Sequence, residues 1–372
     1  MRLADLDTEL TPTAEGGPEL LAGRRGSVGH IRLNRPKALN SLSVEMVRGL
    51  DAALHRFLAD EVVATIVLSG AGERALCAGG DIRALVDTLG NGPAGAEAFW
   101  RDEYHLVSRI ARCRKPYLAL MDGFTMGGGM GMSMHARHRV VTERSKLAMP
   151  ECVIGFFPDV GGSWRLSHAP GEFGTYLGLT GVPANASDSI RAGLADAFVS
   201  IEDLGAFVEA LEGLPTGTTS QNVDTVVAKF SKIPAATPLA AQRENIDRLF
   251  ASDGVAGIVA RLEADGSEFA RDTLAAISAN APTGLVMALR LMRLGRRSNT
   301  LEECLARELA AGIRMVMRPD FREGVRAAVI DKDRNPNWLP ARLADVDEQE
   351  IDSMLTPLDP PLFAVDAARR NA

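Results

Sequence analysis

The sequence predicts an α/β fold with a helical second part, on the evidence of chain length, composition and hydrophobic spacing. Its 372 residues can bury a sizeable core. The 46% hydrophobic and 24% charged shares are those of an ordinary folded chain. Short runs typical of β-strands alternate with longer segments of helical spacing up to about residue 215. From about residue 216 the strand signals fade, and helical patterns continue to about Val329.

These changes divide the chain into three regions. Residues 1–20 are polar and contain several prolines and glycines, which predicts a loose leader with structure beginning near Leu21. Residues 21–215 carry the alternating pattern and form the predicted core. Residues 216–372 form a mostly helical C-terminal region.

Four segments of the core are predicted as β-strands. They are Val28–Leu33, Val62–Leu68, Pro116–Met121 and Arg139–Thr142. After the first of them, Ser43 is a good N-cap for a helix. The apolar stripe of that helix, which includes Val47, Leu50 and Leu54, should lie against the sheet.

One helix of the C-terminal region has clear start and stop signals. Thr300 and Glu303 form a capping box ahead of apolar residues at helical spacing. Pro319 then marks the end of the helix. Its apolar face must meet the core or another subunit.

Charge and cysteine usage exclude several classes of protein. Forty-one basic and 48 acidic side chains give a net charge of -7, which argues against nucleic acid as a partner. The four cysteines lie far apart, so neither a disulfide framework nor a metal site is predicted. No apolar run has the length of a signal peptide or of a membrane span. We therefore expect a cytoplasmic protein that has no membrane partner.

The strongest local signal is a glycine-rich turn at residues 126–131, Met-Gly-Gly-Gly-Met-Gly, directly after a predicted strand. Three successive glycines leave the backbone N–H groups bare, so a ligand can press against them. If a helix begins at this turn, these N–H groups also lie at its positive end and suit an anion. Close helix packing or a flexible turn is the alternative explanation.

A second glycine-rich turn, Cys77-Ala78-Gly79-Gly80-Asp81, follows the strand at residues 62–68. Two such turns after two strands can aim their amides at one point and stabilise the negative charge that grows on a carbonyl oxygen. A plain strand-to-helix connection is the alternative for this turn.

Three acidic residues stand in apolar surroundings. Glu151 and Asp159 lie in the stretch Met-Pro-Glu-Cys-Val-Ile-Gly-Phe-Phe-Pro-Asp-Val-Gly-Gly, whose glycines and prolines allow the two carboxyl groups to converge across a bend. Apolar neighbours would raise their pKa values toward use as a general acid or base. Glu103 falls inside an apolar helical stripe at residues 99–112 and needs a partner or a substrate hydroxyl. The alternatives are a helix-capping Asp159, a solvated Glu151 and a Glu103 at the edge of its stripe.

Together these motifs resemble the crotonase superfamily, the enoyl-CoA hydratases and isomerases, and within it the 3-hydroxyisobutyryl-CoA hydrolase branch. The resemblance covers most of the chain, with a loose match at residues 216–280 and after residue 342. It runs through residues 33–40, both glycine-rich turns, residues 149–162, residues 320–326 and residues 330–333. It implies a ββα spiral core followed by a helical C-terminal region, and a homo-oligomer, either a trimer or a hexamer.

The resemblance also implies roles for individual residues. The amides of Ala78 and Gly128 would form an oxyanion hole around a thioester carbonyl, and Glu151 would be the nucleophile or the acid/base. Asp159 and Glu103 would lie beside the acyl group, so that the substrate contacts Glu103, Gly128, Glu151 and Asp159. The residues implied to contact coenzyme A are Arg35, Lys37, Ala38, Gly79 and Asp81. Solvated surface charge is the alternative for the two basic residues among them.

One departure from the superfamily pattern decides between reactions. Hydratases of this superfamily use a second glutamate three residues after the oxyanion glycine, and that position is Gly131. The hydrolase branch has the aspartate of a Phe-Pro-Asp motif, which is Asp159 in this chain. The resemblance thus implies hydrolysis of a short branched hydroxyacyl-CoA, 3-hydroxyisobutyryl-CoA of valine catabolism, with no cofactor because coenzyme A is part of the substrate. Glu151 would either attack the carbonyl to form a mixed anhydride or activate a water.

Other functions are weighed against this one. An enoyl-CoA hydratase or isomerase working with Glu151 alone is the main alternative, and an idle acyl-CoA-binding protein is another. A serine hydrolase lacks its Gly-X-Ser-X-Gly motif, and a nucleotide enzyme lacks its phosphate-binding patterns. His135 and His138 have no third metal ligand nearby and are predicted to be structural.

Overall fold

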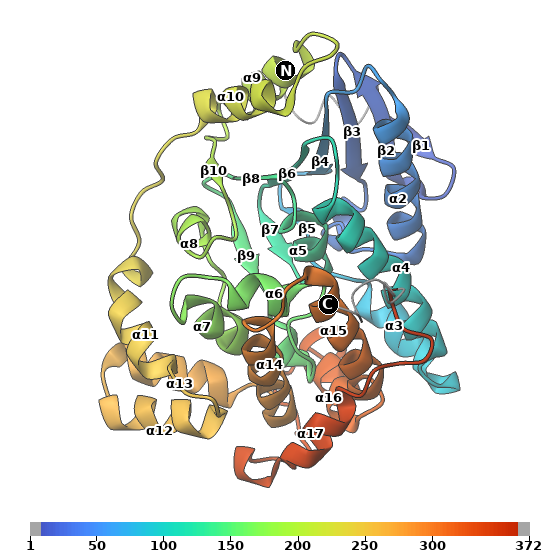
Figure 1. Ribbon diagram of the computed structural model, residues 1–372. Helices are drawn as coiled ribbons and strands as arrows, with labels where there is room; N and C mark the ends of the chain where they lie inside the picture. Colours follow the sequence, from blue (N-terminus) through green and yellow to red (C-terminus); the bar gives the residue numbers. More distant parts are fainter. Residues whose placement is uncertain (1–8, 364–372) are drawn as a thin grey trace, which may run out of the picture.

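The computed structural model describes residues 9–363, in which two β-sheets are surrounded by helices (Figure 1). Within these residues the larger sheet has seven strands and the smaller has three. In spatial order, the larger sheet holds β1 (Thr11–Thr13), β2 (Gly17–Arg25), β3 (Val28–Leu33), β4 (Thr65–Gly70), β6 (Tyr117–Met121), β8 (His138–Val141) and β10 (Ala197–Phe198). The smaller sheet holds β5 (Ala75–Cys77), β7 (Phe124–Met126) and β9 (Lys146–Ala148).

The α/β fold class is confirmed, and the order of the strands is that of a ββα spiral. The successive pairs β4–β5, β6–β7 and β8–β9 each place one strand in the larger sheet and the next in the smaller sheet. From β3 to β10 all pairings in the larger sheet are parallel, as are both pairings in the smaller sheet. Because β5 and β7 are parallel neighbours, their carboxyl ends lie side by side. The two glycine-rich turns that follow these strands therefore leave the small sheet at the same end.

Helices and single helical turns make up the rest of the described structure. In chain order they are η2 (Pro36–Ala38), α2 (Val44–Ala59), α3 (Ile82–Thr88), η3 (Leu89–Asn91), α4 (Ala94–Ala111), α5 (Gly128–Ser133), η4 (Glu151–Ile154), α6 (Gly162–Ser167), α7 (Phe173–Thr180), α8 (Ala186–Arg191), α9 (Leu204–Glu212), α10 (Ser220–Phe230), η5 (Pro238–Gln242), α11 (Arg243–Phe250), α12 (Val255–Asp265), α13 (Glu268–Ser278), α14 (Pro282–Gly295), α15 (Leu301–Met315), α16 (Pro319–Val325), η6 (Arg326–Ile330), η7 (Leu343–Asp345) and α17 (Glu348–Met354). Among residues 9–363 no single helix is long and apolar enough to cross a membrane, and α13 with α14 reaches that length only as a pair bent by 109°.

Helices cover both faces of the larger sheet. On one face, α2 packs its apolar stripe on β2 and β3. The Phe57 ring of α2 lies so close to β3 that a Cβ built on Gly29 would be 2.6 Å from Phe57 Cγ. The predicted cap is present, because the Ser43 side chain accepts a hydrogen bond from the Met46 amide at 3.2 Å. On the other face, α9 and α10 bury Phe207 and other apolar side chains against β4, β6 and β8.

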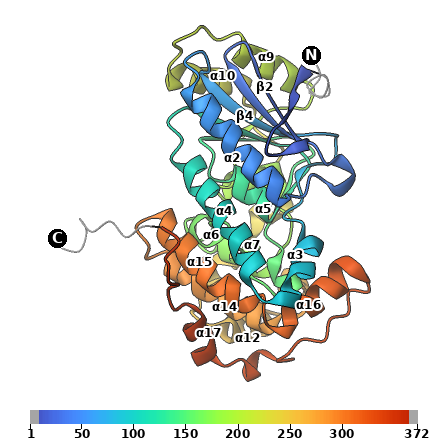
Figure 2. The ribbon, with the colours of Figure 1, turned by 90° about the vertical axis from the view of Figure 1, so that its right-hand side faces the viewer.

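The C-terminal helices do not form a separate core. Helix α14 packs on α6 and α7, and α15 packs on α4 and α6 (Figure 2). Their buried side chains belong to the same continuous cluster as those of α2 and the sheet. The apolar face of α15 therefore meets the core. The first half of its predicted capping box is present, because Thr300 Oγ1 accepts from the Glu303 amide at 3.3 Å, but Glu303 Oε2 accepts from the Asn299 amide rather than from that of Thr300.

The predicted loose leader differs from the structure where the two can be compared. Residues 1–8 lie outside the described residues, but β1 and β2 occupy much of the stretch from residue 11 to 25. Leu20 is fully buried under α2. Pro12 did not exclude a strand, because it lies on the edge strand β1, whose register with β2 shifts between Pro12 and Thr13.

Candidate active site

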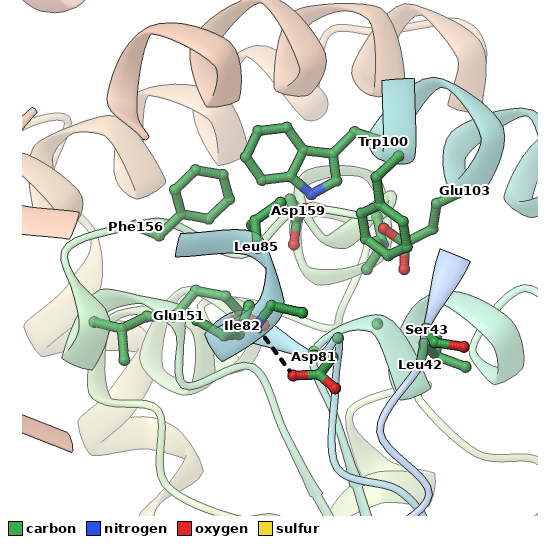
Figure 3. A pocket seen from close by; sticks show the side chains of 18 of the residues that line it. Leu42, Ser43, Asp81, Ile82, Leu85, Trp100, Glu103, Glu151, Phe156 and Asp159 are labelled. Carbon is green, nitrogen blue, oxygen red and sulfur yellow. Dashed lines mark hydrogen bonds between the residues drawn. The ribbon is translucent and has the colours of Figure 1, made fainter. Parts of the chain in front are cut away.

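A cavity of about 440 Å³ lies where the two glycine-rich turns meet α3, α4, η4 and the turn at Asp159 and Val160. Figure 3 shows Trp100 and Phe156 on one side of this space, with the three acidic side chains Glu103, Glu151 and Asp159 around it. The two aromatic rings stack with centroids 5.4 Å apart. The cavity thus combines an apolar wall with a few polar groups, as small-molecule sites do.

Two backbone amides border the same part of the cavity. Gly128 is the first residue of α5, so its N–H has no acceptor within that helix. In the described part of the chain, neither the Gly128 amide nor the Gly80 amide donates to a backbone carbonyl. A Cβ built on Gly128 would lie 3.3 Å from Gly80 N, so both amides border the same small space.

The predicted Ala78 donor is corrected by this geometry. The Ala78 amide already donates to the Leu39 carbonyl at 3.0 Å, so it cannot also bind a substrate oxygen. The neighbouring Asp81 amide is likewise bonded, to the Leu42 carbonyl at 2.9 Å. Gly80 therefore replaces Ala78 as the candidate partner of Gly128.

Glu151 opens η4 and lies against the first glycine of the α5 turn. Its side chain is 7% exposed, and a Cβ on Gly127 would lie 2.9 Å from Glu151 Oε1. Glu151 Oε2 is buried and has no hydrogen-bond partner among the described residues. Burial, followed by the charge of Asp159, raises the pKa of Glu151 well above its usual value.

Asp159 and Glu103 complete a cluster of three buried carboxyl groups. Asp159 Oδ2 accepts a hydrogen bond from the Tyr104 hydroxyl at 2.7 Å. Burial, with Glu308 nearby, raises the pKa of Asp159 to about 7, although the Tyr104 hydrogen bond acts in the opposite direction. Glu103 lies inside the buried face of α4, as its helical position predicts, and Glu103 Oε1 has no hydrogen-bond partner in the described structure. Burial and then the charge of Asp159 raise the pKa of Glu103 well above its usual value.

The space beside Gly131 is filled by Val160. A Cβ on Gly131 would lie 2.7 Å from Val160 Cβ, so a glutamate at this position would displace the turn that follows Asp159. The chain therefore lacks a second glutamate on α5 and also lacks room for one.

The predicted contacts to coenzyme A are only partly brought to the cavity. Gly79 and Asp81 line it, whereas Arg35, Lys37 and Ala38 do not. Arg35 forms ion pairs with Glu19 at 3.0 Å and with Asp81 at 3.1 Å. Its guanidinium thus holds the second glycine-rich turn in place, which differs from the predicted contact with a phosphate group.

Sequence patterns did not reveal the roles of two residues beside the site, Tyr104 and Glu308. The Tyr104 hydroxyl donates a hydrogen bond to Asp159, and Glu308 of α15 accepts one from the backbone next to Asp159.

The two histidines that were considered as metal ligands have separate partners. His135 Nε2 is 3.1 Å from the Val160 carbonyl, and His138 pairs with Asp224. Among residues 9–363 no group of His, Cys, Asp and Glu side chains is arranged to hold a metal ion.

Comparisons with known proteins agree with the fold. The enoyl-CoA hydratase/isomerase family matches residues 28–355. The chain is 40% identical to the mitochondrial 3-hydroxyisobutyryl-CoA hydrolase of Danio rerio, over 93% of this chain and 92% of that one, and 39% identical to that of Homo sapiens, over 91% and 89%. Among solved structures it is similar to a carnitinyl-CoA dehydratase from Mycobacterium thermoresistibile, with TM-score 0.87 and 39% identity over 93% of this chain and 98% of that one. It is also similar to an enoyl-CoA hydratase from Rhodobacter sphaeroides, with TM-score 0.85 and 41% identity over 93% and 100%.

The comparisons contradict the predicted cytoplasmic location. The hydrolases from Danio rerio and Homo sapiens are both named as mitochondrial. The prediction was wrong because it depended on the lack of an apolar leader. Segments that direct proteins to mitochondria are amphipathic rather than apolar, so this criterion cannot detect them.

Proposed function

The chain belongs to the enoyl-CoA hydratase/isomerase family, and from this premise we propose that it hydrolyses 3-hydroxyisobutyryl-CoA to 3-hydroxyisobutyrate and coenzyme A. Relatives about 40% identical over some 90% of the chain carry the name of this hydrolase. The observation that carries the proposal is the pairing of Gly131 with Val160, which leaves no place for a second glutamate on α5. Addition of water across a double bond needs two acid/base groups, whereas thioester hydrolysis can proceed with Glu151 at the carbonyl carbon.

In the proposed reaction the thioester carbonyl oxygen lies between the amides of Gly80 and Gly128. Each such donor stabilises the negative oxygen of the tetrahedral intermediate by on the order of 3 kcal/mol. Glu151 acts on the carbonyl carbon by one of two routes. In the first its carboxylate attacks, coenzyme A thiolate leaves, and water cleaves the resulting anhydride. In the second it takes a proton from a water that attacks directly.

Asp159 and Glu103 are proposed to bind the acyl group. Both residues are buried and line the cavity, and a Cβ on Gly128 would lie 2.8 Å from Glu103 Oε1, which has no hydrogen-bond partner among the described residues. A 3-hydroxyl group can donate to either carboxyl, whereas a long alkyl chain would leave Glu103 Oε1 without a hydrogen-bond partner. This favours short hydroxyacyl groups. Coenzyme A enters as part of the substrate, and the proposed reaction uses no cofactor.

A thiol-release assay tests the proposed function. With 3-hydroxyisobutyryl-CoA we expect stoichiometric release of free thiol, measured with a chromogenic disulfide. With crotonyl-CoA we expect no loss of the enoyl absorbance. Loss of enoyl absorbance without free thiol would identify a hydratase instead. Binding of every acyl-CoA in a small panel without turnover would identify an idle binding protein.

The reaction should depend on pH through the buried carboxyl cluster. Glu151 reacts as a carboxylate, and burial together with Asp159, Glu308 and Glu103 raises its pKa. Because the raised pKa keeps this group protonated at low pH, kcat/KM for thiol release should still be rising with pH above the range in which an ordinary glutamate titrates. The measurement is kcat/KM from pH 5 to pH 9, corrected for spontaneous hydrolysis. A profile already flat above pH 5 would contradict the assignment.

Assembly of the chain stays a prediction from the family resemblance. A trimer or hexamer is expected, and light scattering on the purified protein measures its mass directly. A monomer would contradict the expectation and leave the proposed chemistry untouched, because all the residues named for the reaction come from one chain.

A further inference from the structure

The turn that carries Asp159 has an unusual backbone. Val160 has a φ of 50° and Gly161 a φ of 82°, both in the left-handed region. Glycine adopts this conformation freely, but a β-branched residue such as valine is rarely found there. A valine in this conformation must be held by its surroundings.

Glu308 provides three contacts that hold this turn. It lies on α15 with no exposed surface, and it is not among the described residues that line the cavity. Glu308 Oε2 accepts from the Gly161 amide at 2.7 Å, and Oε1 accepts from the Ser163 amide at 3.0 Å. The Ser163 hydroxyl also donates to Oε1. One buried carboxylate therefore fixes the backbone on the C-terminal side of Val160.

The left-handed conformation of Val160 determines where Val160 and Asp159 make their contacts. The Val160 side chain packs against Gly131, and the Val160 carbonyl faces His135 Nε2 at 3.1 Å. The Gly162 amide donates to the Asp159 carbonyl at 2.6 Å. With the backbone fixed in this way, the Asp159 side chain reaches the cavity and the Tyr104 hydroxyl.

We propose that Glu308 is a positioning residue for the reaction. By binding the amides of Gly161 and Ser163, it holds Val160 in the left-handed conformation and so keeps the Asp159 carboxyl in the cavity. Without these bonds Val160 would relax to negative φ and turn Asp159 away from the acyl group. The inference rests on the proposed function, in which Asp159 contacts the acyl group.

Glu308→Gln tests the inference, because glutamine keeps the shape but presents an N–H group to one of the donors. We expect kcat for thiol release from 3-hydroxyisobutyryl-CoA to fall by about 10- to 100-fold, the scale of a displaced contact group. The Kd for coenzyme A should stay unchanged. Ser163→Ala removes only one of the three contacts, the hydroxyl one, and leaves both amide contacts in place, so its kcat should fall less than that of Glu308→Gln.

A rescue experiment separates positioning from a purely structural role. Glycine at residue 160 adopts positive φ without support. The double variant Glu308→Gln/Val160→Gly should therefore recover part of the kcat that Glu308→Gln loses. If Glu308 only stabilised the core, the second loss of packing would lower kcat further, and that result would overturn the inference.

Two outcomes distinguish this inference from the proposed function. A wild-type protein that releases no thiol refutes the function. A wild-type protein that releases thiol, beside a folded Glu308→Gln variant with equal kcat, refutes the inference alone. If Glu308→Gln does not fold, Glu308→Asp replaces it, because it keeps the charge and retracts the carboxylate by one methylene. A folded Glu308→Asp variant with wild-type kcat would also refute the inference, and a reduced kcat would support it.

Discussion

Replacing Glu151 by glutamine is expected to lower kcat for thiol release by about 100- to 10,000-fold, the range of a removed acid/base group. The amide keeps the size of the side chain but can neither attack a carbonyl nor take a proton. Its effect should appear in kcat, with the Kd for coenzyme A unchanged, because Glu151 is proposed to act at the thioester rather than on the nucleotide. Stopped-flow or steady-state thiol assays, together with calorimetric titration of coenzyme A, measure the two quantities.

The companion change Asp159→Asn should lower kcat less than Glu151→Gln does, since Asp159 is proposed to orient the acyl group without reacting.

A quenched wild-type reaction separates the two chemical routes proposed for Glu151, attack by its carboxylate and attack by water. Attack by Glu151 produces protein heavier by one acyl group, whereas attack by water does not. Turnover by Glu151→Gln at the wild-type rate would refute the assignment of this residue under either route.

Local patterns predicted the parts of the structure that depend on neighbouring residues. The strand at residues 28–33 has the predicted bounds, and all of its residues are buried. The Ser43 and Thr300 caps are present because each depends on a residue only three positions away. Glu103 is buried, as its place in the helical stripe of α4 predicts.

Contacts between distant segments could not be predicted in this way. Whether Ala78 or Gly80 offers a free amide depends on the loop that carries Leu39, and this loop joins the turn from another part of the chain. Arg35 is a basic residue in a loop, but its ion pairs with Glu19 and Asp81 appear only once the chain is folded. Glu308 lies 149 residues from Asp159 along the sequence and acts beside it through backbone amides, which leave no pattern in the side chains.

The position of the Gly80 and Gly128 amides predicts a second large effect on kcat, from a substitution at Gly128. Gly128→Ala should lower kcat for thiol release by about 100- to 1000-fold, the cost of losing an oxyanion donor. The new methyl group would lie 2.8 Å from Glu103 Oε1 and 3.3 Å from Gly80 N. It would thus occupy the space in which the thioester oxygen is proposed to bind. Thiol release under saturating 3-hydroxyisobutyryl-CoA measures the effect.

Gly254→Ala is the matched control for this change, because it adds the same methyl group where a Cβ would meet no atom within 4 Å. Gly254 lies just before α12, away from the cavity, so kcat should not change. If Gly128→Ala folds and retains wild-type kcat, the carbonyl oxygen does not bind between the amides of Gly80 and Gly128. The polarisation of the thioester would then need another donor, and Glu151 would have to act on a carbonyl placed elsewhere in the cavity.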